Sequence, residues 1–192
     1  MEYLVAGLVL VAAVAAINAA LTLAVMRRWR ERVSTPPATA HSHGSVEPDS
    51  DPDLGIAAGA RMPAFTAVTA DGVTVTRDDL AGREALIAFL SLDCSGCDDS
   101  LPAFGERARE LRAAGGIVLA TVVGIDAAES ELASRLAGIA DFVVPEFLDA
   151  PVSNHFGARY YPGFAHYGAD ELAIAAGIGM EGLAKSAQPS AL

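Results

Sequence analysis

The sequence predicts an α/β domain, in which helices flank a mixed β-sheet, preceded by one transmembrane helix. Three observations support this prediction. An uncharged run occupies residues 3–26, apolar runs of strand length lie at 85–92 and 117–123, and a segment with helical periodicity separates these two runs. Buried strands of parallel sheets are continuous apolar runs, and strands that alternate with helices form a helix-covered sheet.

The first predicted element is a membrane-spanning helix. Residues 3–26 carry no charged side chain, and as a helix they extend about 36 Å, longer than the roughly 30 Å hydrocarbon core of a bilayer. Asn18 and Thr22 are the only clearly polar residues of the run, so it lacks the polar face of an amphipathic helix. A cleaved signal peptide begins with a basic region and ends at a small-residue cleavage site. Since both are absent, we expect a retained anchor.

The charges around the anchor bear on its orientation. Only the amino terminus and Glu2 precede it, whereas four arginines follow closely, at positions 27, 28, 30 and 32. The positive-inside rule then places the rest of the chain in the cytoplasm. We assign residues 1–32 to the anchor with its basic flank, and expect a single-pass cell-membrane protein that contacts the lipid bilayer through residues 3–26.

A flexible linker is predicted between the anchor and the domain. Residues 33–59 are rich in Ser, Thr, Pro, Ala, Asp and His and contain almost no large apolar side chains. Such a segment buries too little surface to offset the entropy of ordering. The globular domain is expected to span residues 60–187, and residues 188–192 form a short tail.

The domain is predicted to begin with a hairpin and a central strand. The alternating patterns at 65–69 and 73–76 predict two strands, and the Asp71-Gly72 pair between them favours a tight turn. Residues 78–80 are expected to form a single helical turn. The continuous apolar run at 85–92 is typical of a buried strand.

Helices and strands alternate in the rest of the domain. Apolar residues recur at helical spacing from Cys97 to Leu111, which predicts a helix that ends before Gly115-Gly116. The order βαβα followed by ββα predicts a mixed sheet with helices on both faces. The later elements are expected to be a strand at 117–123, a helix at 127–136, a short strand at 142–144, a hairpin of strands at 164–167 and 172–176, and a helix at 180–187.

Composition narrows the possible functions. The net charge is −11, whereas phosphate binding requires clustered Lys and Arg, so we exclude nucleic acid as a partner. Cys94 and Cys97 are the only cysteines. A disulfide that closes so short a loop adds little stability, so the pair is expected to serve chemistry or metal binding.

Cys94 and Cys97 form a Cys-x-x-Cys motif between the predicted central strand and the predicted helix. The thiolate is the nucleophile of thiol chemistry, and the amides at a helix N-terminus stabilise it. We expect Cys94 to attack a disulfide and Cys97 to resolve the mixed disulfide that results. Ser95 and Gly96 keep the turn small and open. The alternatives are a zinc site, which needs about four ligands, and a pair of inert buried cysteines.

With this motif and its surroundings, the sequence resembles the thioredoxin superfamily, and in particular its membrane-anchored TlpA/MauD-like branch. The resemblance implies that Pro102 is the proline that thioredoxins carry in their active-site helix. It also implies that Pro162 is a cis-proline facing the disulfide and that Tyr161 offers backbone groups to a bound substrate strand. The resemblance covers residues 60–187, and most of it lies in the stretch ALIAFLSLDCSGCDDSLPAF. The stretch GARMPAFTAVTADGVTVTRDDLAG resembles the N-terminal hairpin of that branch, and ARYYPGFAHYGADELAIAAGI resembles the segment with the cis-proline loop and the following hairpin.

The sequence departs from the thioredoxin pattern around the cysteines. Asp93 stands where many thioredoxins have Trp, Ala88 replaces their buried carboxylate, and Asp98 and Asp99 follow the motif directly. Negative charge beside a thiolate disfavours it. We therefore expect that the pKa of Cys94 is not strongly depressed, and that the protein reduces disulfides instead of forming them.

Other functions stay open beside the thioredoxin-like oxidoreductase. Ser91, three residues before Cys94, is similar to the Thr/Ser-x-x-Cys motif of peroxiredoxins, which are peroxidases on the same fold. A non-enzymatic accessory or maturation module that binds a membrane partner is a second alternative. The resemblance also implies a domain outside the cytoplasm, opposite to the charge rule.

The expected partners follow from the oxidoreductase prediction. They are a client protein that carries a disulfide and an upstream thiol that supplies electrons. We expect no metal, nucleotide or flavin cofactor, because the two cysteines carry the chemistry themselves.

Overall fold

The computed structural model describes residues 53–188 of the 192-residue chain. The predicted anchor at 3–26, most of the predicted linker and the tail beyond 188 lie outside these residues. Within residues 53–188, every helix is too short or too polar to cross a bilayer.

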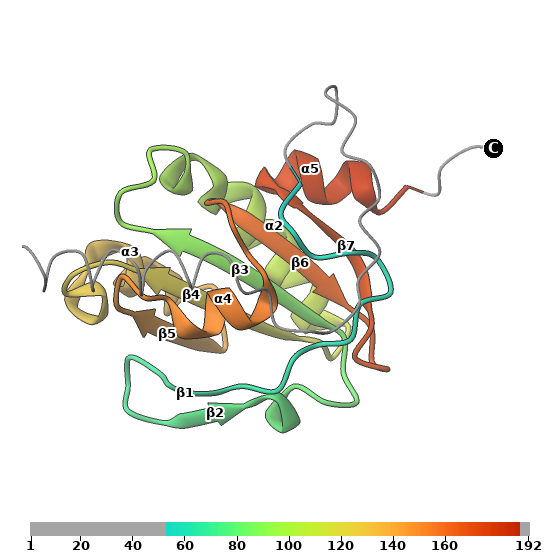
Figure 1. The fold of residues 1–192 in the computed structure, drawn as a ribbon, viewed down its shortest axis with the longest axis horizontal. Coiled ribbons are helices and arrows are strands. Elements are labelled where there is room, and N and C mark those ends of the chain that lie inside the picture. The colour runs from blue at the N-terminus through green and yellow to red at the C-terminus, as the bar shows by residue number, and fades with distance from the viewer. Residues whose placement is uncertain (1–52, 189–192) are drawn as a thin grey trace, which may run out of the picture. The chain divides into compact units, whose positions relative to one another are not determined.

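A five-stranded mixed sheet forms the centre of the domain (Figure 1). Its strand order is β5-β4-β3-β6-β7, in which β3, β4 and β5 are parallel and β6 and β7 are antiparallel to their neighbours. This arrangement confirms the predicted mixed sheet, with β5 and β7 longer than expected. The strands are β3 (Ala85–Ser91), β4 (Ile117–Val123), β5 (Phe142–Glu146), β6 (Gly163–Tyr167) and β7 (Ala173–Ile178).

The two faces of the sheet bury separate hydrophobic clusters. Alternate residues of β3 point to opposite sides, with Leu86 and Leu90 in one cluster and Ile87 and Phe89 in the other. Helices α2 (Cys97–Ala113), α3 (Glu131–Leu136) and α5 (Gly179–Ser186) cover the first face. The second face is covered by the hairpin of β1 (Thr66–Val68) and β2 (Thr74–Thr76) and by helix α4 (Pro151–Phe156). The short 3-10 helix η1 (Arg77–Asp79) follows β2, and Leu80 directly after it packs in the same cluster.

Two helical elements differ from the prediction. The single helix expected at 127–136 is divided into the 3-10 turn η2 (Ala127–Glu129) and α3, because Ser130 adopts an extended backbone and accepts a hydrogen bond from the Ala133 amide. The short helix α4 was not predicted. It begins with Pro151 and ends at Phe156, before Gly157, whose φ is +81°.

The domain begins earlier than the predicted boundary at residue 60. Leu54 is fully buried and Ile56 is 5% exposed, and both pack in the cluster that α4 covers. Further along, the amide of Gly59 donates to the carbonyl of Ala173, and the amide of Ala173 donates to the carbonyl of Ala60. Residues 59–62 therefore pair with residues 171–173, where β7 begins, so residues 53–59 belong to the folded domain and not to the linker.

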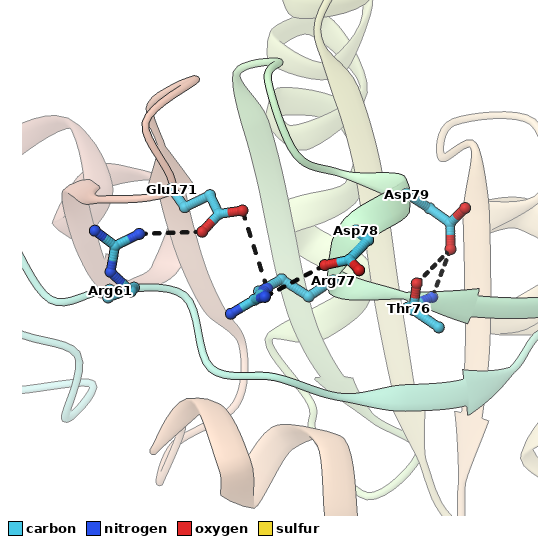
Figure 2. Close-up of polar contacts among 6 residues, drawn as sticks. All are labelled: Arg61, Thr76, Arg77, Asp78, Asp79 and Glu171. Carbon is cyan, nitrogen blue, oxygen red and sulfur yellow. Dashed lines mark hydrogen bonds and ion pairs between the residues drawn. The ribbon is translucent and has the colours of Figure 1, made fainter.

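Ion pairs join this N-terminal segment to η1 through the β6–β7 turn. Figure 2 shows the carboxylate of Glu171 between two arginines, at 3.2 Å from Nη1 of Arg61 and 3.9 Å from Nε of Arg77. Both the amide and the hydroxyl of Thr76 donate to the Asp79 carboxylate, which closes the start of η1. These hydrogen bonds lower the pKa of Asp79 below its usual value. The two ion pairs of Glu171 connect three segments that are distant in sequence: the N-terminal segment, η1 and the β6–β7 turn.

The contact between β7 and α5 depends on a glycine. A Cβ at Gly177 would overlap the backbone of Gly182 and lie 2.5 Å from the Leu183 nitrogen. We expect Gly177→Ala to reduce the free energy of unfolding by about 1–3 kcal/mol, since α5 must shift away from the sheet. Urea unfolding followed by circular dichroism measures this change.

Gly182→Ala is the matched control for this glycine contact. Its Cβ would lie 3.4 Å from the nearest atoms of Gly177, which is ordinary contact. Because alanine favours a helix over glycine, this variant is expected to stabilise the protein by about 0.5–1 kcal/mol. Equal effects of the two substitutions would contradict the close approach.

Candidate functional site

The two cysteines lie where β3 ends and α2 begins. They form a disulfide, with their Cα atoms 5.4 Å apart. The turn between the strand and the helix is fixed by backbone hydrogen bonds, from the Leu92 amide to the Val123 carbonyl and from the Cys94 amide to the Ser91 carbonyl. Cys94 is partly exposed, whereas Cys97 is 1% exposed. The sulfur of Cys94 is therefore the one that a partner protein can approach.

Helix α2 positions Cys97 as its first residue. One face of the helix buries Leu101, Phe104, Ala108 and Leu111, which matches the predicted spacing and holds the helix against the sheet. Pro102 lies in the second turn and is exposed. Within the motif Ser95 is exposed, as is Asp93 just before it, and Gly96 is half-buried.

The Tyr161–Pro162 segment faces the motif from the start of β6. The peptide bond before Pro162 is cis, in agreement with the resemblance-based expectation. A Cβ placed on Gly96 would lie 3.7 Å from Cδ of Pro162, so this proline lies against the Cys-x-x-Cys turn. Tyr161 is half-buried, and burial raises the pKa of its phenol above the usual value.

A buried carboxylate on β5 holds helix α4, which precedes the Tyr161–Pro162 segment in the chain. Glu146 is 4% exposed and accepts hydrogen bonds from the Val152 amide at 2.5 Å and from the Ser153 amide and hydroxyl at 3.1 and 2.5 Å. It thereby holds the first turn of α4, which leads to the Tyr161–Pro162 bond. Sequence reasoning missed Glu146, because a single acid at the end of an apolar run does not reveal its burial.

A pocket of about 240 Å³ lies beside the disulfide, and both cysteines line it. The other side of the pocket is formed by the start of α3, including Ser130 and Glu131. Arg135, also on α3, donates from Nη1 to Oδ1 of Asp98 at 2.6 Å, so the two residues form an ion pair in the pocket wall.

Sequence reasoning did not single out these α3 residues. A signal was present, because α3 follows β4, and the carboxyl ends of the parallel strands β3 and β4 meet at one edge of the sheet. The described residues contain no group of three or more His, Cys, Asp or Glu side chains arranged to hold a metal ion.

Comparisons with known proteins agree with this fold. The AhpC/TSA family profile matches residues 58–161. None of the curated proteins matches the sequence. The thioredoxin domain of a Bacteroides vulgatus thiol-disulfide oxidoreductase is 17% identical, with a TM-score of 0.54 over 68% of this chain and 94% of that one.

Two further solved structures have the same fold. A putative thioredoxin from Neisseria meningitidis is 26% identical, with a TM-score of 0.51 over 62% of this chain and 81% of that one. A putative thiol:disulfide interchange protein DsbE from Chlorobium tepidum is 19% identical, with a TM-score of 0.53 over 65% and 86% of the two chains.

Proposed function

Because the chain belongs to the thioredoxin-like AhpC/TSA family, we propose that it is a membrane-tethered thiol–disulfide oxidoreductase that reduces the disulfides of a client protein. The observation that carries this proposal is the Cys94–Cys97 disulfide at the N-terminus of α2. One of its sulfurs is partly exposed and the other is buried, as an attacking and a resolving cysteine require.

The proposed reaction proceeds through a mixed disulfide. In the reduced protein, the thiolate of Cys94 attacks one sulfur of the client disulfide, so that a Cys94–client bond forms and the other client sulfur leaves as a thiolate. The thiolate of Cys97 then attacks the sulfur of Cys94 and releases the second client thiolate. Two electrons and two protons pass from the cysteine pair to the client. An upstream donor with two thiols then reduces the Cys94–Cys97 disulfide by the same exchange and is itself oxidised to a disulfide.

The surroundings of the motif support the reducing direction. Asp98 and Asp99 are both exposed in the first turn of α2, and Ala88 stands where thioredoxins have a buried acid. Negative charge near the sulfurs disfavours thiolate, and a poorly stabilised thiolate makes the reduced pair a stronger reductant. Pro162 and Tyr161 are proposed to shape the groove for the client strand.

The redox equilibrium of the pair tests this proposal. We expect the full chain in detergent to show a reversible two-electron couple near or below about −220 mV when equilibrated with glutathione or dithiothreitol. Alkylation of free thiols followed by mass spectrometry measures the reduced fraction. A potential near the strongly oxidising end, about −120 mV, would contradict the reductase direction. If no intramolecular disulfide forms, the oxidoreductase proposal itself fails.

A peroxidase is the second candidate, because Ser91 and Cys94 line the same pocket. Peroxide consumption coupled to thioredoxin would favour this activity, whereas a disulfide reductase is expected to leave hydrogen peroxide unchanged and to reduce protein disulfides. Full complementation of a deletion by Cys94→Ala would instead favour a non-enzymatic accessory module that binds a membrane partner.

The membrane location is part of the same proposal. We propose a single-pass anchor at residues 3–26, supported by the uncharged run there. The arginines after it favour a cytoplasmic domain, and the family resemblance favours the opposite side. Since all thiols of the chain belong to the motif, labelling of reduced intact cells with a membrane-impermeant maleimide distinguishes the two orientations.

A further inference from the structure

The Asp98–Arg135 ion pair lies beside the cysteines although its partners are far apart in sequence. Asp98 belongs to the first turn of α2, directly after Cys97, and Arg135 belongs to the last turn of α3. Their side chains approach to 2.6 Å. Both residues line the pocket that Cys94 and Cys97 also line, so both charges lie in the same small region as the cysteines.

The charges around the pocket are unbalanced. Among the described residues that line it, Asp98 and Glu131 are acidic and Arg135 carries the single positive charge. Asp93 and Asp99, which flank the motif, are exposed and add negative charge nearby. A single arginine therefore opposes the acidic residues at the site where a thiolate must form.

We propose that Arg135 regulates the redox equilibrium of the Cys94–Cys97 pair by offsetting the charge of Asp98. The inference rests on the proposed oxidoreductase function and deepens it. In the reduced protein, a positive charge near Cys94 favours the thiolate and a negative charge disfavours it. Because the two charges of the pair are opposite, each limits the effect of the other on the sulfur.

The expected size of the effect follows from the exposure of the pair. The side chains of Asp98 and Arg135 are 68% and 44% exposed, so water screens their charges. At such a high effective dielectric constant, a unit charge several ångströms away changes an ionisation equilibrium by about 2- to 5-fold. Such a change in the thiol ionisation is modest but measurable. An ion pair that only stabilised the fold would leave the thiol ionisation unchanged.

Two charge-neutralising variants of the full chain test the inference. Arg135→Gln is expected to raise the pKa of the Cys94 thiol. At a pH above that pKa, where the reduced protein carries the thiolate, it is expected to shift the glutathione equilibrium about 2- to 5-fold towards the protein disulfide, since the thiolate loses a favourable charge. Asp98→Asn is expected to shift both quantities in the opposite direction. Both shifts should shrink when salt is added, because salt screens exposed charges.

Arg107→Gln is the matched control. Arg107 is 40% exposed and forms an ion pair with Glu110 further along α2, away from the pocket. This variant is expected to leave the thiol pKa and the glutathione equilibrium unchanged. Any general loss of stability is measured separately by urea unfolding, and by itself it does not move the thiol pKa in opposite directions in two variants.

The possible outcomes are distinct. Opposite shifts for Arg135→Gln and Asp98→Asn, with no shift for Arg107→Gln, support the inference. Unchanged values in both variants, or shifts in the same direction, overturn it. The thiol pKa is read from the pH dependence of iodoacetamide alkylation of the reduced protein, which requires no disulfide exchange. The inference is therefore tested even if the wild-type chain forms no reversible disulfide and the proposed function fails.

Discussion

Cys97→Ser is expected to trap the protein in a mixed disulfide with its client, whereas Cys94→Ser is expected to lower disulfide reduction at least about 10³-fold. The reason is the different position of the two sulfurs. Cys94 is partly exposed and can attack, but Cys97 is 1% exposed and reaches only the sulfur of Cys94. Without Cys97 the Cys94–client bond has no resolving thiolate, so the intermediate accumulates.

The trapped species identifies the client directly. Cells that express Cys97→Ser in the full chain are quenched with acid, and complexes are separated with and without reductant. A reductant-sensitive band that disappears in the Cys94→Ser/Cys97→Ser double variant is the expected result. Trapping by Cys94→Ser and not by Cys97→Ser would reverse the assigned roles, and equal trapping by both would contradict distinct roles. Full activity of either single variant would remove the pair from the mechanism.

Phe156→Ala is expected to reduce the free energy of unfolding by about 3–5 kcal/mol, the largest stability effect we predict. Phe156 ends helix α4 and is 5% exposed. Its ring lies 5.5 Å from the rings of Phe65 and Phe89 and 5.9 Å from that of Tyr167, measured between centroids. Removal of the ring leaves a cavity where the hairpin, the central sheet and α4 meet.

Phe147→Ala is the matched control for this substitution. Phe147 precedes α4 and is 61% exposed, so its loss is expected to change the free energy of unfolding by no more than about 0.5 kcal/mol. Urea unfolding followed by circular dichroism compares the two variants. Similar effects at both positions would show that the aromatic cluster does not anchor α4.

The central elements were predictable because their patterns are local. The apolar runs of β3 and β4 and the helical spacing of α2 fixed both the strands and the position of the cysteines between them. Helix α4 was not predictable, because a six-residue helix has little stability of its own. It depends on the Glu146 carboxylate and the burial of Phe156, which are contacts from elsewhere in the chain.

In the site, too, the local motif could be predicted from the sequence, whereas contacts between distant residues could not. The four residues of the Cys-x-x-Cys motif are enough to predict thiol–disulfide chemistry, and the resemblance indicated the proline that faces the motif. Arg135 belongs to no motif, and its contact with Asp98 spans 37 residues and depends on where α3 packs. The position of its helix directly after β4 was the one signal for it. The N-terminal boundary was wrong for a related reason, because two buried side chains, Leu54 and Ile56, lie in a segment of otherwise linker-like composition.

The pairing of residues 59–62 with β7 has a consequence for aggregation. A sheet with free outer strands can recruit extended chains through its unpaired backbone groups. Here that segment pairs with the first residue of β7, Ala173, and β5, at the other side of the sheet, contains Pro145, which has no N–H to donate. Part of each outer strand is thereby made unavailable for pairing with an extended chain, which disfavours fibrous or amorphous assembly.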